Sequence, residues 1–239
     1  MKRRMKMLPF IRSAFENLIY LFYPTLCAGC QAMLYGEEKG LCSTCRMQLP
    51  HLNTGEEQSV LLHKFGGRVL VDYVCAYAYF TKKSIVQRLI HQMKYRGKRD
   101  LGLQLGKWYG QELAELNGLP MQADMLIPVP IHSLRREQRG YNQSEWIAEG
   151  LSMSMGIVSR PDVMERTQFI SSQTRKNRID RWTNVANVFK VMKPIVVQGQ
   201  HVIIVDDVLT TGATLEACIA QLRAAGAATI GIITIAATR

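Results

Sequence analysis

Strand-like and helix-like spacings of hydrophobic residues alternate through most of the chain. Apolar residues at helical spacing over 8–23, followed by Pro24, predict a short amphipathic helix. Further along, β-branched and aromatic residues gather in strand-like segments, and apolar residues recur every three or four positions in helix-like ones. The predicted strands are 69–80, 124–129, 201–205 and 229–235, and the predicted helices are 81–95, 101–116, 142–155 and 213–224. This alternation predicts an α/β domain with a mainly parallel sheet flanked by helices.

Two stretches lack this periodicity. Residues 51–67 are polar and contain glycine, which is typical of a linker or an exposed loop. Residues 166–189 are polar and basic, and they predict a mobile loop followed by a helix. We therefore divide the chain into an N-terminal module over 1–50, a linker over 51–70 and an α/β domain over 71–239.

Composition narrows the class of protein. The 239 residues are 47% hydrophobic and 21% charged, which excludes a disordered or collagen-like chain and leaves enough apolar material for a sizeable core. The net charge is +11 at pH 7. Such a basic balance favours an anionic partner, either a phosphorylated metabolite or a nucleic acid.

The pattern of the N-terminal segment does not predict a signal peptide or a membrane anchor. Its start over 1–6 is basic, but Arg12 and Glu16 interrupt the following apolar stretch, and no small-residue cleavage site follows. The longest apolar run there is far shorter than the roughly 18 residues that a spanning helix needs. We expect a cytoplasmic protein with no membrane span.

Four of the six cysteines form two C-x-x-C pairs, Cys27 with Cys30 and Cys42 with Cys45. Two such pairs, with eleven residues between them (31–41), can bring four thiolates to one tetrahedral Zn²⁺. A closed four-thiolate shell leaves no open position, so the predicted zinc is structural. A redox C-x-x-C pair is the alternative, but it predicts one motif at a helix start rather than two motifs close together. The remaining two cysteines, in apolar segments, are expected to be core thiols; they are Cys75 and Cys218.

The most informative stretch is 201–214, where a buried strand leads to two acids, a tight loop and a helix. Ligands of open α/β sheets bind at the carboxyl ends of the strands, which is where Asp206 and Asp207 emerge. The loop after them combines hydroxyl groups, a glycine and a helix N-terminus, which together favour phosphate binding. Its residues are Thr210, Thr211, Gly212, Ala213 and Thr214.

Two acids beside a phosphate cradle need partners other than the anion. Vicinal sugar hydroxyls or a hydrated Mg²⁺ suit them, so the implied ligand contains a ribose 5-phosphate unit. The alternative is that Asp206 and Asp207 only cap or solvate a turn. A Walker A loop is excluded, since its Gly-x-x-x-x-Gly-Lys-Ser/Thr pattern does not occur.

Residues 202–214 resemble the signature of type I phosphoribosyltransferases. In those enzymes the acid pair contacts the ribose hydroxyls of phosphoribosyl pyrophosphate (PRPP), and the Thr-Gly-x-Thr loop holds its 5-phosphate. The cysteine pairs, together with Ile-Pro-Val-Pro at 127–130 and the segment 135–143, narrow the resemblance to the ComF family, including ComFC and GntX-like proteins. The resemblance covers nearly the whole chain. It implies a type I phosphoribosyltransferase fold with a small N-terminal four-cysteine zinc module.

The resemblance also implies roles for further residues. It makes Asp206 and Asp207 the catalytic acids, with Mg²⁺ bound together with PRPP. The loop after the strand that ends near 129 corresponds to the pyrophosphate loop, and a flexible hood matches 166–184. The implied pyrophosphate-loop residues are Pro128, Val129, Pro130, Arg135, Arg136 and Arg139, and those of the hood region are Gln173, Arg178 and Asn184. Arg181 is a helix-surface candidate in the same stretch. Guanidinium groups bind pyrophosphate oxygens bidentately, although any single arginine also fits a solvated basic surface.

The family resemblance implies a PRPP-binding protein that transfers phosphoribosyl to an unidentified acceptor, an activity of the glycosyltransferase class. It also implies a link to competence and DNA uptake, with a competence helicase or uptake proteins as partners. Turnover stays open, because none of the five histidines has a spacing that marks a general base, and His132 is only a weak candidate. GntX-like members are linked to gluconate use, so the pathway is open too.

The alternative function is a non-catalytic module that binds single-stranded DNA on the same fold. Basic residues in or after one predicted helix lie around Tyr95, an arrangement that can follow a phosphate backbone. They are Lys82, Lys83, Arg88, Lys94, Arg96, Lys98 and Arg99. A solvated basic helix face explains the same pattern equally well.

Overall fold

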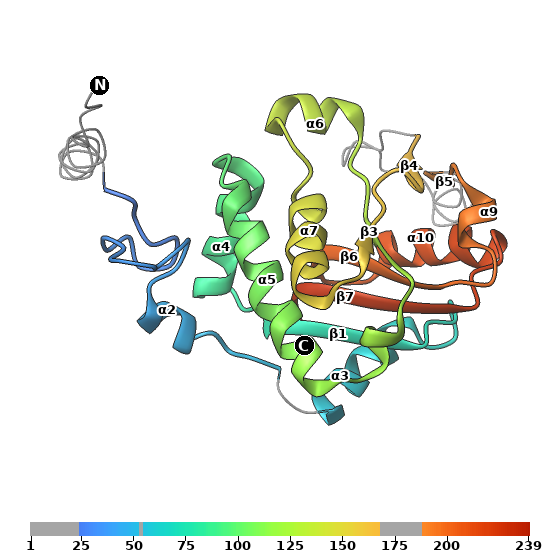
Figure 1. The fold of residues 1–239 in the computed structure, drawn as a ribbon, viewed down its shortest axis with the longest axis horizontal. Coiled ribbons are helices and arrows are strands. Elements are labelled where there is room, and N and C mark those ends of the chain that lie inside the picture. Colours follow the sequence, from blue (N-terminus) through green and yellow to red (C-terminus); the bar gives the residue numbers. More distant parts are fainter. Residues whose placement is uncertain (1–23, 53–54, 168–187) are drawn as a thin grey trace, which may run out of the picture.

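A five-stranded parallel sheet organises the chain. The computed structural model describes residues 24–52, 55–167 and 188–239 (Figure 1). The strands of this sheet are β1 (Tyr73–Tyr79), β2 (Met125–Pro128), β3 (Val158–Ser159), β6 (His201–Leu209) and β7 (Thr229–Ala237). Their order is β1-β7-β6-β2-β3, and every neighbouring pair is parallel. The predicted α/β class with a mainly parallel sheet is confirmed.

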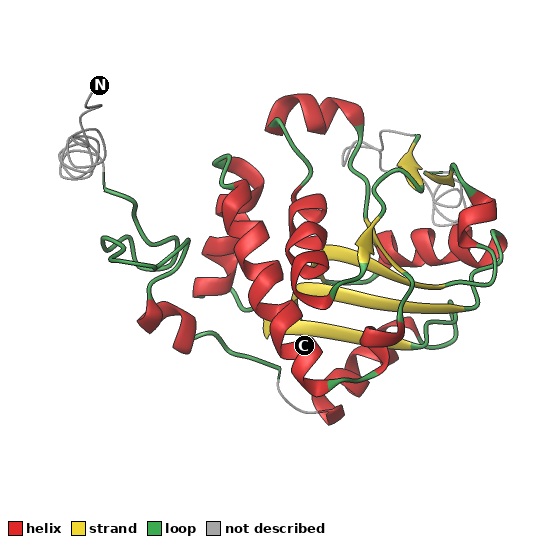
Figure 2. Cartoon of the chain, viewed as in Figure 1, coloured by secondary structure: helices red, strands yellow, loops and turns green. Residues whose placement is uncertain are grey.

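Helices cover both faces of this sheet (Figure 2). The α-helices are α2 (Ser43–Met47), α3 (Gly55–Leu62), α4 (Ile85–Tyr95), α5 (Arg99–Leu116), α6 (Ser133–Arg139), α7 (Gln143–Met155), α9 (Pro194–Val197) and α10 (Ala213–Ala224). Short 3-10 helices follow α3 at His63–Phe65 and α5 at Leu119–Gln122. The four predicted helices correspond to α4, α5, α7 and α10.

Strand β6 shows why the central segment reads as a continuous apolar run. Ile203 and Val205 pack among α4, α5 and α7, whereas Val202 and Ile204 pack with α3 and α10. All four side chains are fully buried. A parallel strand that is buried on both faces has no polar alternation, so its apolar run stops only where the acids begin.

A second, antiparallel pair of strands flanks the hood region. It consists of β4 (Met164–Arg166) and β5 (Phe189–Val191). The expected mobile loop and helix between these strands lie mostly outside the described residues, as does the amphipathic helix expected over 8–23.

The cysteine module packs directly on the α/β domain. Cys27 and Ala28 are fully buried in the same hydrophobic cluster as residues of α4 and α5. The Ala28 carbonyl oxygen accepts a hydrogen bond from Gln92 Nε2 at 2.8 Å. The Arg46 guanidinium lies over the Trp108 ring, 4.5 Å from its centroid. The module is therefore built into one face of the core.

The structure differs from the expected linker over 51–70. This stretch holds α3 and a 3-10 helix, and its Leu61 and Phe65 are buried. The side chain of Gln58 pairs with the edge strand β1: its Oε1 accepts from the Ala76 N–H at 2.8 Å, and its Nε2 donates to the Ala76 carbonyl at 3.1 Å. A polar residue thus docks this helix, which explains why hydrophobic periodicity does not reveal it.

Helices α5 and α7 approach each other closely through two glycines. A Cβ on Gly106 would lie 2.3 Å from the Ile147 carbonyl oxygen, and a Cβ on Gly150 would lie 2.1 Å from that of Leu103. Only residues without a side chain allow backbones this near. The contact matters for function because α7 carries, at its N-terminal end, residues that reach the acid pair.

We expect Gly150→Ala to lower the free energy of unfolding by about 1–3 kcal/mol or more, because the added methyl group forces α5 and α7 apart. Urea denaturation measures this change. Gly55→Ala is the matched control, since Gly55 lies in α3 and nothing lies within 4 Å of a Cβ built there. A Gly150→Ala protein as stable as the wild type would contradict the close contact.

Candidate functional site

The acid pair lies at the carboxyl end of β6, held by side chains from two helices. Ser144 Oγ donates to Asp206 Oδ1 at 2.9 Å, and the Asp207 N–H donates to the same oxygen at 2.8 Å. Gln143 Nε2 donates to Asp207 Oδ2 at 3.1 Å, and Lys94 Nζ forms an ion pair with that oxygen at 2.9 Å. Both carboxylates therefore have fixed orientations.

The loop after β2 is tied to the start of α7. Asn142 caps this helix, because its side-chain oxygen accepts from the Ser144 N–H at 3.1 Å. Its Nδ2 donates to the Val129 carbonyl at 3.0 Å. The preceding Tyr141 hydroxyl donates to the Met93 carbonyl at the end of α4. These bonds place the first residues of α7 against the acids.

Electrostatics distinguish one acid of the pair. Burial and the charge of Asp207 raise the pKa of Asp206 to about 7, although hydrogen bonds and Lys94 oppose this shift. Burial and the nearby Arg135 lower the pKa of the Arg166 guanidinium, while the charge of Asp206 raises it. The site thus contains a carboxyl group that titrates near neutral pH, with two arginines in its surroundings.

The threonine loop lies beside Asp206. Gly212 adopts a φ of +83°, and a Cβ there would lie 2.9 Å from the buried ring of Phe65, so this position requires glycine. Gly212 is also the N-cap residue of α10, and it provides no side-chain cap for that helix. The residues that line a small hollow with Asp206 include Thr210, Thr211, Gly212, Ala213 and Thr214, whose threonines are exposed. The loop therefore offers hydroxyl and N–H donors to an anion.

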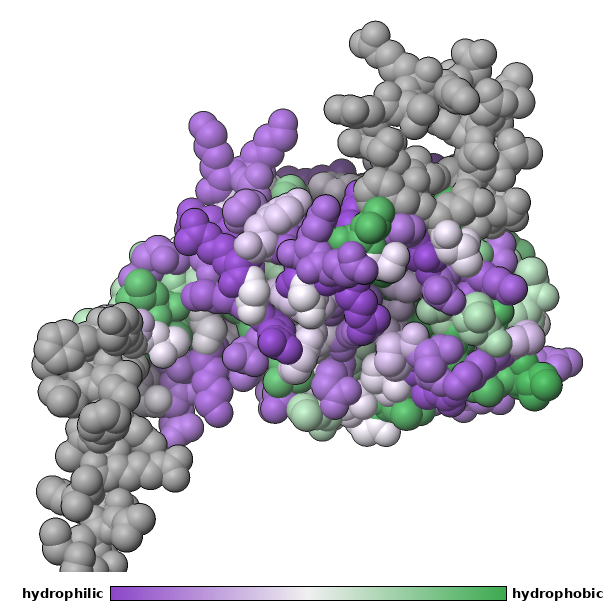
Figure 3. Space-filling model, turned by 90° about the horizontal axis from the view of Figure 1, so that it is seen from above, coloured by the Kyte–Doolittle hydropathy of each residue, from purple (hydrophilic) through white to green (hydrophobic). Residues whose placement is uncertain are grey.

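The three predicted pyrophosphate-loop arginines lie on α6, a helix that sequence periodicity does not predict. All seven residues of α6 are at least partly exposed, and the helix stands out from the sheet (Figure 1). Arg136 pairs with Glu145 at 3.0 Å, whereas Arg139 donates to Gln143 Oε1 at 3.2 Å and lies over the Tyr95 ring. Seen from the side on which α6 stands, the molecule is mainly hydrophilic (Figure 3).

The structure brings some predicted site residues together and adds others. Asp206 and the threonine loop share one hollow, and Asp207 follows Asp206 along β6, while Pro128, Val129 and Pro130 lead from β2 toward α6. The predicted hood residues and Arg181 lie outside the described residues; the hood residues are Gln173, Arg178 and Asn184. The site residues that sequence reasoning missed are Lys94, Gln143, Ser144 and Arg166. Gln143 had a signal as part of the quoted 135–143 motif, and Arg166 as the first residue of the segment that matches the hood, whereas the charge of Lys94 indicates only a DNA contact.

The four cysteines of the N-terminal module converge on one point. Their Sγ atoms all lie within 4.8 Å of one another, and those of Cys30 and Cys42 are 3.8 Å apart. A tetrahedral zinc site with Zn–S bonds of about 2.3 Å requires separations of roughly 3.8 Å. Sulfur also accepts backbone hydrogen bonds, since the N–H groups of Gly29 and Cys42 both donate to Cys27 Sγ at 3.3 Å. Although burial opposes the change, such backbone bonds lower the pKa of Cys27 to about 7. The residues fit a four-thiolate metal site.

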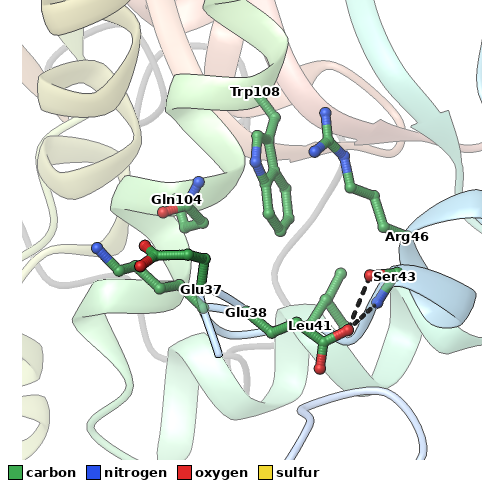
Figure 4. Close-up of a pocket in the computed structure, with 8 residues that line it drawn as sticks. Glu37, Glu38, Leu41, Ser43, Arg46, Gln104 and Trp108 are labelled. Carbon is green, nitrogen blue, oxygen red and sulfur yellow. Dashed lines mark hydrogen bonds between the residues drawn. The ribbon is translucent and has the colours of Figure 1, made fainter. Parts of the chain in front are cut away.

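A separate hollow of about 400 Å³ lies between the cysteine module and α5 (Figure 4). Two residues of α5, Trp108 and Gln104, line one side of this hollow, and Glu37, Glu38 and Arg46 of the module line the other. The Ser43 hydroxyl donates a hydrogen bond to the Glu38 carboxylate. Its described lining includes neither the acid pair nor the threonine loop.

Comparison with protein families gives a match to the phosphoribosyl transferase domain over residues 122–239. The DNA utilization protein YhgH of Salmonella typhi is 31% identical over 147 residues, which are 60% of this chain and 63% of that protein. The chain thus spans less than two thirds of that relative's length. Competence protein F of Haemophilus influenzae is 26% identical over 225 residues, 86% of this chain and 93% of that protein. Competence protein ComFC of Bacillus subtilis is 25% identical over 138 residues, which cover 57% of this chain and 53% of that protein.

Solved structures show weaker likeness. The glutamine PRPP amidotransferase of B. subtilis has a TM-score of 0.42 and 20% identity, covering 59% of this chain and 30% of that one. Purine phosphoribosyltransferase of Pyrococcus horikoshii has a TM-score of 0.33 and 19% identity, covering 55% of this chain and 84% of that one. Among the described residues, no helix is both long and apolar enough to span a membrane.

Proposed function

Because this chain belongs to the ComF family of phosphoribosyltransferase-like proteins, we propose that its acid pair and threonine loop bind Mg²⁺-PRPP. One observation carries this proposal. Two oriented carboxylates lie toward the carboxyl end of a strand of the parallel sheet, and one of them, Asp206, lines a hollow together with exposed threonine residues and the N-terminus of α10. Carboxylates accept hydrogen bonds from vicinal hydroxyls, while the loop donates to a phosphate, so the two halves match a ribose 5-phosphate.

In this proposal each part of PRPP has protein side chains that bind it. Asp206 and Asp207 accept from the ribose hydroxyls, and Thr210, Thr211 and Thr214 donate to the 5-phosphate. Arg135 and Arg139 are placed to attract the pyrophosphate, because both lie near residues of the acid site. When bound, Mg²⁺ neutralises part of the pyrophosphate charge.

The reaction class that fits this site is phosphoribosyl transfer. The bond between the anomeric carbon and pyrophosphate breaks, pyrophosphate leaves with the bonding electrons, and an acceptor atom bonds to that carbon. No general base is assigned among the described histidines near the site. His132 Nδ1 accepts from the Leu134 N–H at 3.2 Å, whereas His201 lies at the amino end of β6, where its Nε2 is 2.8 Å from the Tyr73 hydroxyl.

We expect the double variant Asp206→Asn, Asp207→Asn to lose saturable Mg²⁺-PRPP binding, because the amides keep the shape but remove both charges. Calorimetric titration of PRPP in the presence of Mg²⁺ measures the affinity. Asp162→Asn is the matched control, since Asp162 is an exposed acid paired with Arg160 and Lys193. Equal binding by the double variant and the control would refute the assignment.

We expect Thr211→Ala to weaken PRPP binding by about ten- to a hundredfold without abolishing it, because one hydrogen bond to a charged group contributes roughly 1.5–3 kcal/mol. The same titration detects the change, and Thr81→Ala, at an exposed threonine before α4, should bind like the wild type. The opposite result would contradict a phosphate cradle in this loop. In that result, Thr211→Ala would bind PRPP with unaltered affinity and would bind ribose without the 5-phosphate with a changed affinity.

We propose zinc as the ion of the four-cysteine site, in a structural role. Four thiolates close a tetrahedral shell, so no ligand position is open for catalysis. Cys27 and Cys45 belong to the same buried cluster as residues of α4 and α5, which makes metal loading part of the folding of this face of the domain.

We expect the purified protein to hold about one zinc ion per chain by elemental analysis. Cys27→Ser should reduce the zinc content and lower the melting temperature, because a ligand and its link to the core are both lost. Cys75→Ala removes a thiol of β1 outside the cluster and should keep the zinc. A metal-free protein with unchanged melting temperature would contradict a structural zinc.

The names of the relatives refer to the use of DNA. Two are named DNA utilization protein YhgH and competence protein F. We propose that the chain acts in the same process, as a PRPP-binding component. A competence helicase or other uptake proteins as partners stay a prediction.

The alternative single-stranded DNA track along α4 has less support from the arrangement of its basic residues. Lys94 points into the acid site, and Arg88 Nε donates to the Gly29 carbonyl at 2.8 Å. The remaining cations fall into two groups at opposite ends of α4, at 82–83 and 96–99. An 11-residue helix is about 16 Å long, so these groups do not form one continuous row.

A further inference from the structure

The last turn of α4 contacts three parts of the site through three consecutive residues. The Met93 carbonyl accepts from the Tyr141 hydroxyl, just before α7. Lys94 pairs with Asp207, and the Tyr95 ring lies beneath the Arg139 guanidinium of α6, 5.3 Å away. This turn therefore joins the acid pair to the loop that carries the predicted pyrophosphate residues.

The ion pair between Lys94 and Asp207 lies largely away from water. The side chain of Lys94 is 22% exposed and that of Asp207 only 4%. Gln143 donates to the same Oδ2 atom that Lys94 contacts, whereas Asp207 Oδ1 has no hydrogen-bond partner among the described residues. Oδ1 is thus the oxygen left for a ligand. Removing one member of a buried pair leaves the other charge uncompensated, so this lysine has a strong influence on the acid.

The backbone of α4 is itself anchored. Gln92 and Arg88 donate to the carbonyls of Ala28 and Gly29 in the cysteine module. Arg88 and Gln92 thus hold one part of α4 against the cysteine module, and the bond from Tyr141 to the Met93 carbonyl holds its end. The ammonium group of Lys94 therefore has a defined position beside the acids. A solvated surface lysine would have no such anchors.

We propose that Lys94 is a positioning residue of the ribose-phosphate site, which orients Asp207 and balances the charge of the acid pair so that both acids are ionised when Mg²⁺-PRPP binds. The inference rests on the proposed function. It assigns to Lys94 a role in ligand binding that is distinct from the DNA contact that its charge alone indicates.

The groups around the acids determine in which direction loss of the Lys94 charge shifts the pKa of Asp206. Lys94 faces them from α4, Arg166 from β4, Cys218 from α10, and the uncharged Gln143 and Ser144 from α7. Burial and Asp207 raise the pKa of Asp206, and Lys94 lowers it. Loss of the lysine charge leaves two neighbouring carboxylates with less compensation, so the proton stays on the pair up to a higher pH.

The experiment is a calorimetric titration of Mg²⁺-PRPP from about pH 6 to pH 9 with the wild type, Lys94→Gln, Lys94→Arg and Lys190→Gln. We expect Lys94→Gln to bind at least tenfold more weakly at neutral pH and to recover part of its affinity as the pH rises. The midpoint of its binding profile should move up by about one pH unit, the size expected for a nearby opposite charge. Lys94→Arg should restore much of the wild-type profile. Lys190→Gln, at an exposed lysine of β5, should match the wild type.

A second measurement separates this inference from the proposed function. Carbon-13 NMR of the Asp206 carboxyl, recorded without PRPP, should show its titration moving to higher pH in Lys94→Gln. A loss of affinity equal at every pH, with an unmoved Asp206 titration, would make Lys94 merely structural and overturn the inference while PRPP binding stands. If the wild type fails to bind Mg²⁺-PRPP, the proposed function falls, and with it the role of Lys94 in ligand binding.

Discussion

Two adjacent carboxylates that follow the fully buried residues 202–205 of β6 impose the constraint around which the rest of the domain is arranged. Negative charges so close together and so poorly solvated need compensation. The chain supplies it from two separate helices: an ammonium group from α4, and an amide and a hydroxyl from the first turn of α7. The positions of both helices follow from this requirement as much as from hydrophobic burial.

Helix α7 reaches the acids because its far side packs so closely on α5. The glycine contacts between these helices fix the depth of α7 over the sheet, and the Asn142 cap fixes the start of its first turn. On the other side, α4 is fastened to the cysteine module through Gln92 and Arg88. The module therefore lies in the same layer as the helices that hold the acid pair.

The site combines fixed and exposed parts. The acids and their partners are held by several bonds each, whereas the threonine hydroxyls and the arginines of α6 are open to solvent. Such a division suits a ligand with a neutral sugar between two anionic ends. In the proposed complex the sugar would meet oriented acceptors, and the phosphates would meet donors that can adjust to them.

The amino-acid sequence by itself determined the alternation of strands and helices, the acid pair, the threonine loop and the four-cysteine cluster. These features are local: each depends on residues a few positions apart, through hydrophobic period, helix-start chemistry or ligand spacing. The tertiary structure decided what depends on distant parts of the chain. It turned Lys94 from a surface cation into a partner of Asp207, 113 positions later in the chain, and placed Ser144 on Asp206. It also docked the supposed linker on β1 through Gln58, and bound the cysteine module to α4. No local sequence pattern reveals such pairings. A lysine or a glutamine is the same letter in the sequence whether its side chain is surrounded by water or bound to a buried carboxylate.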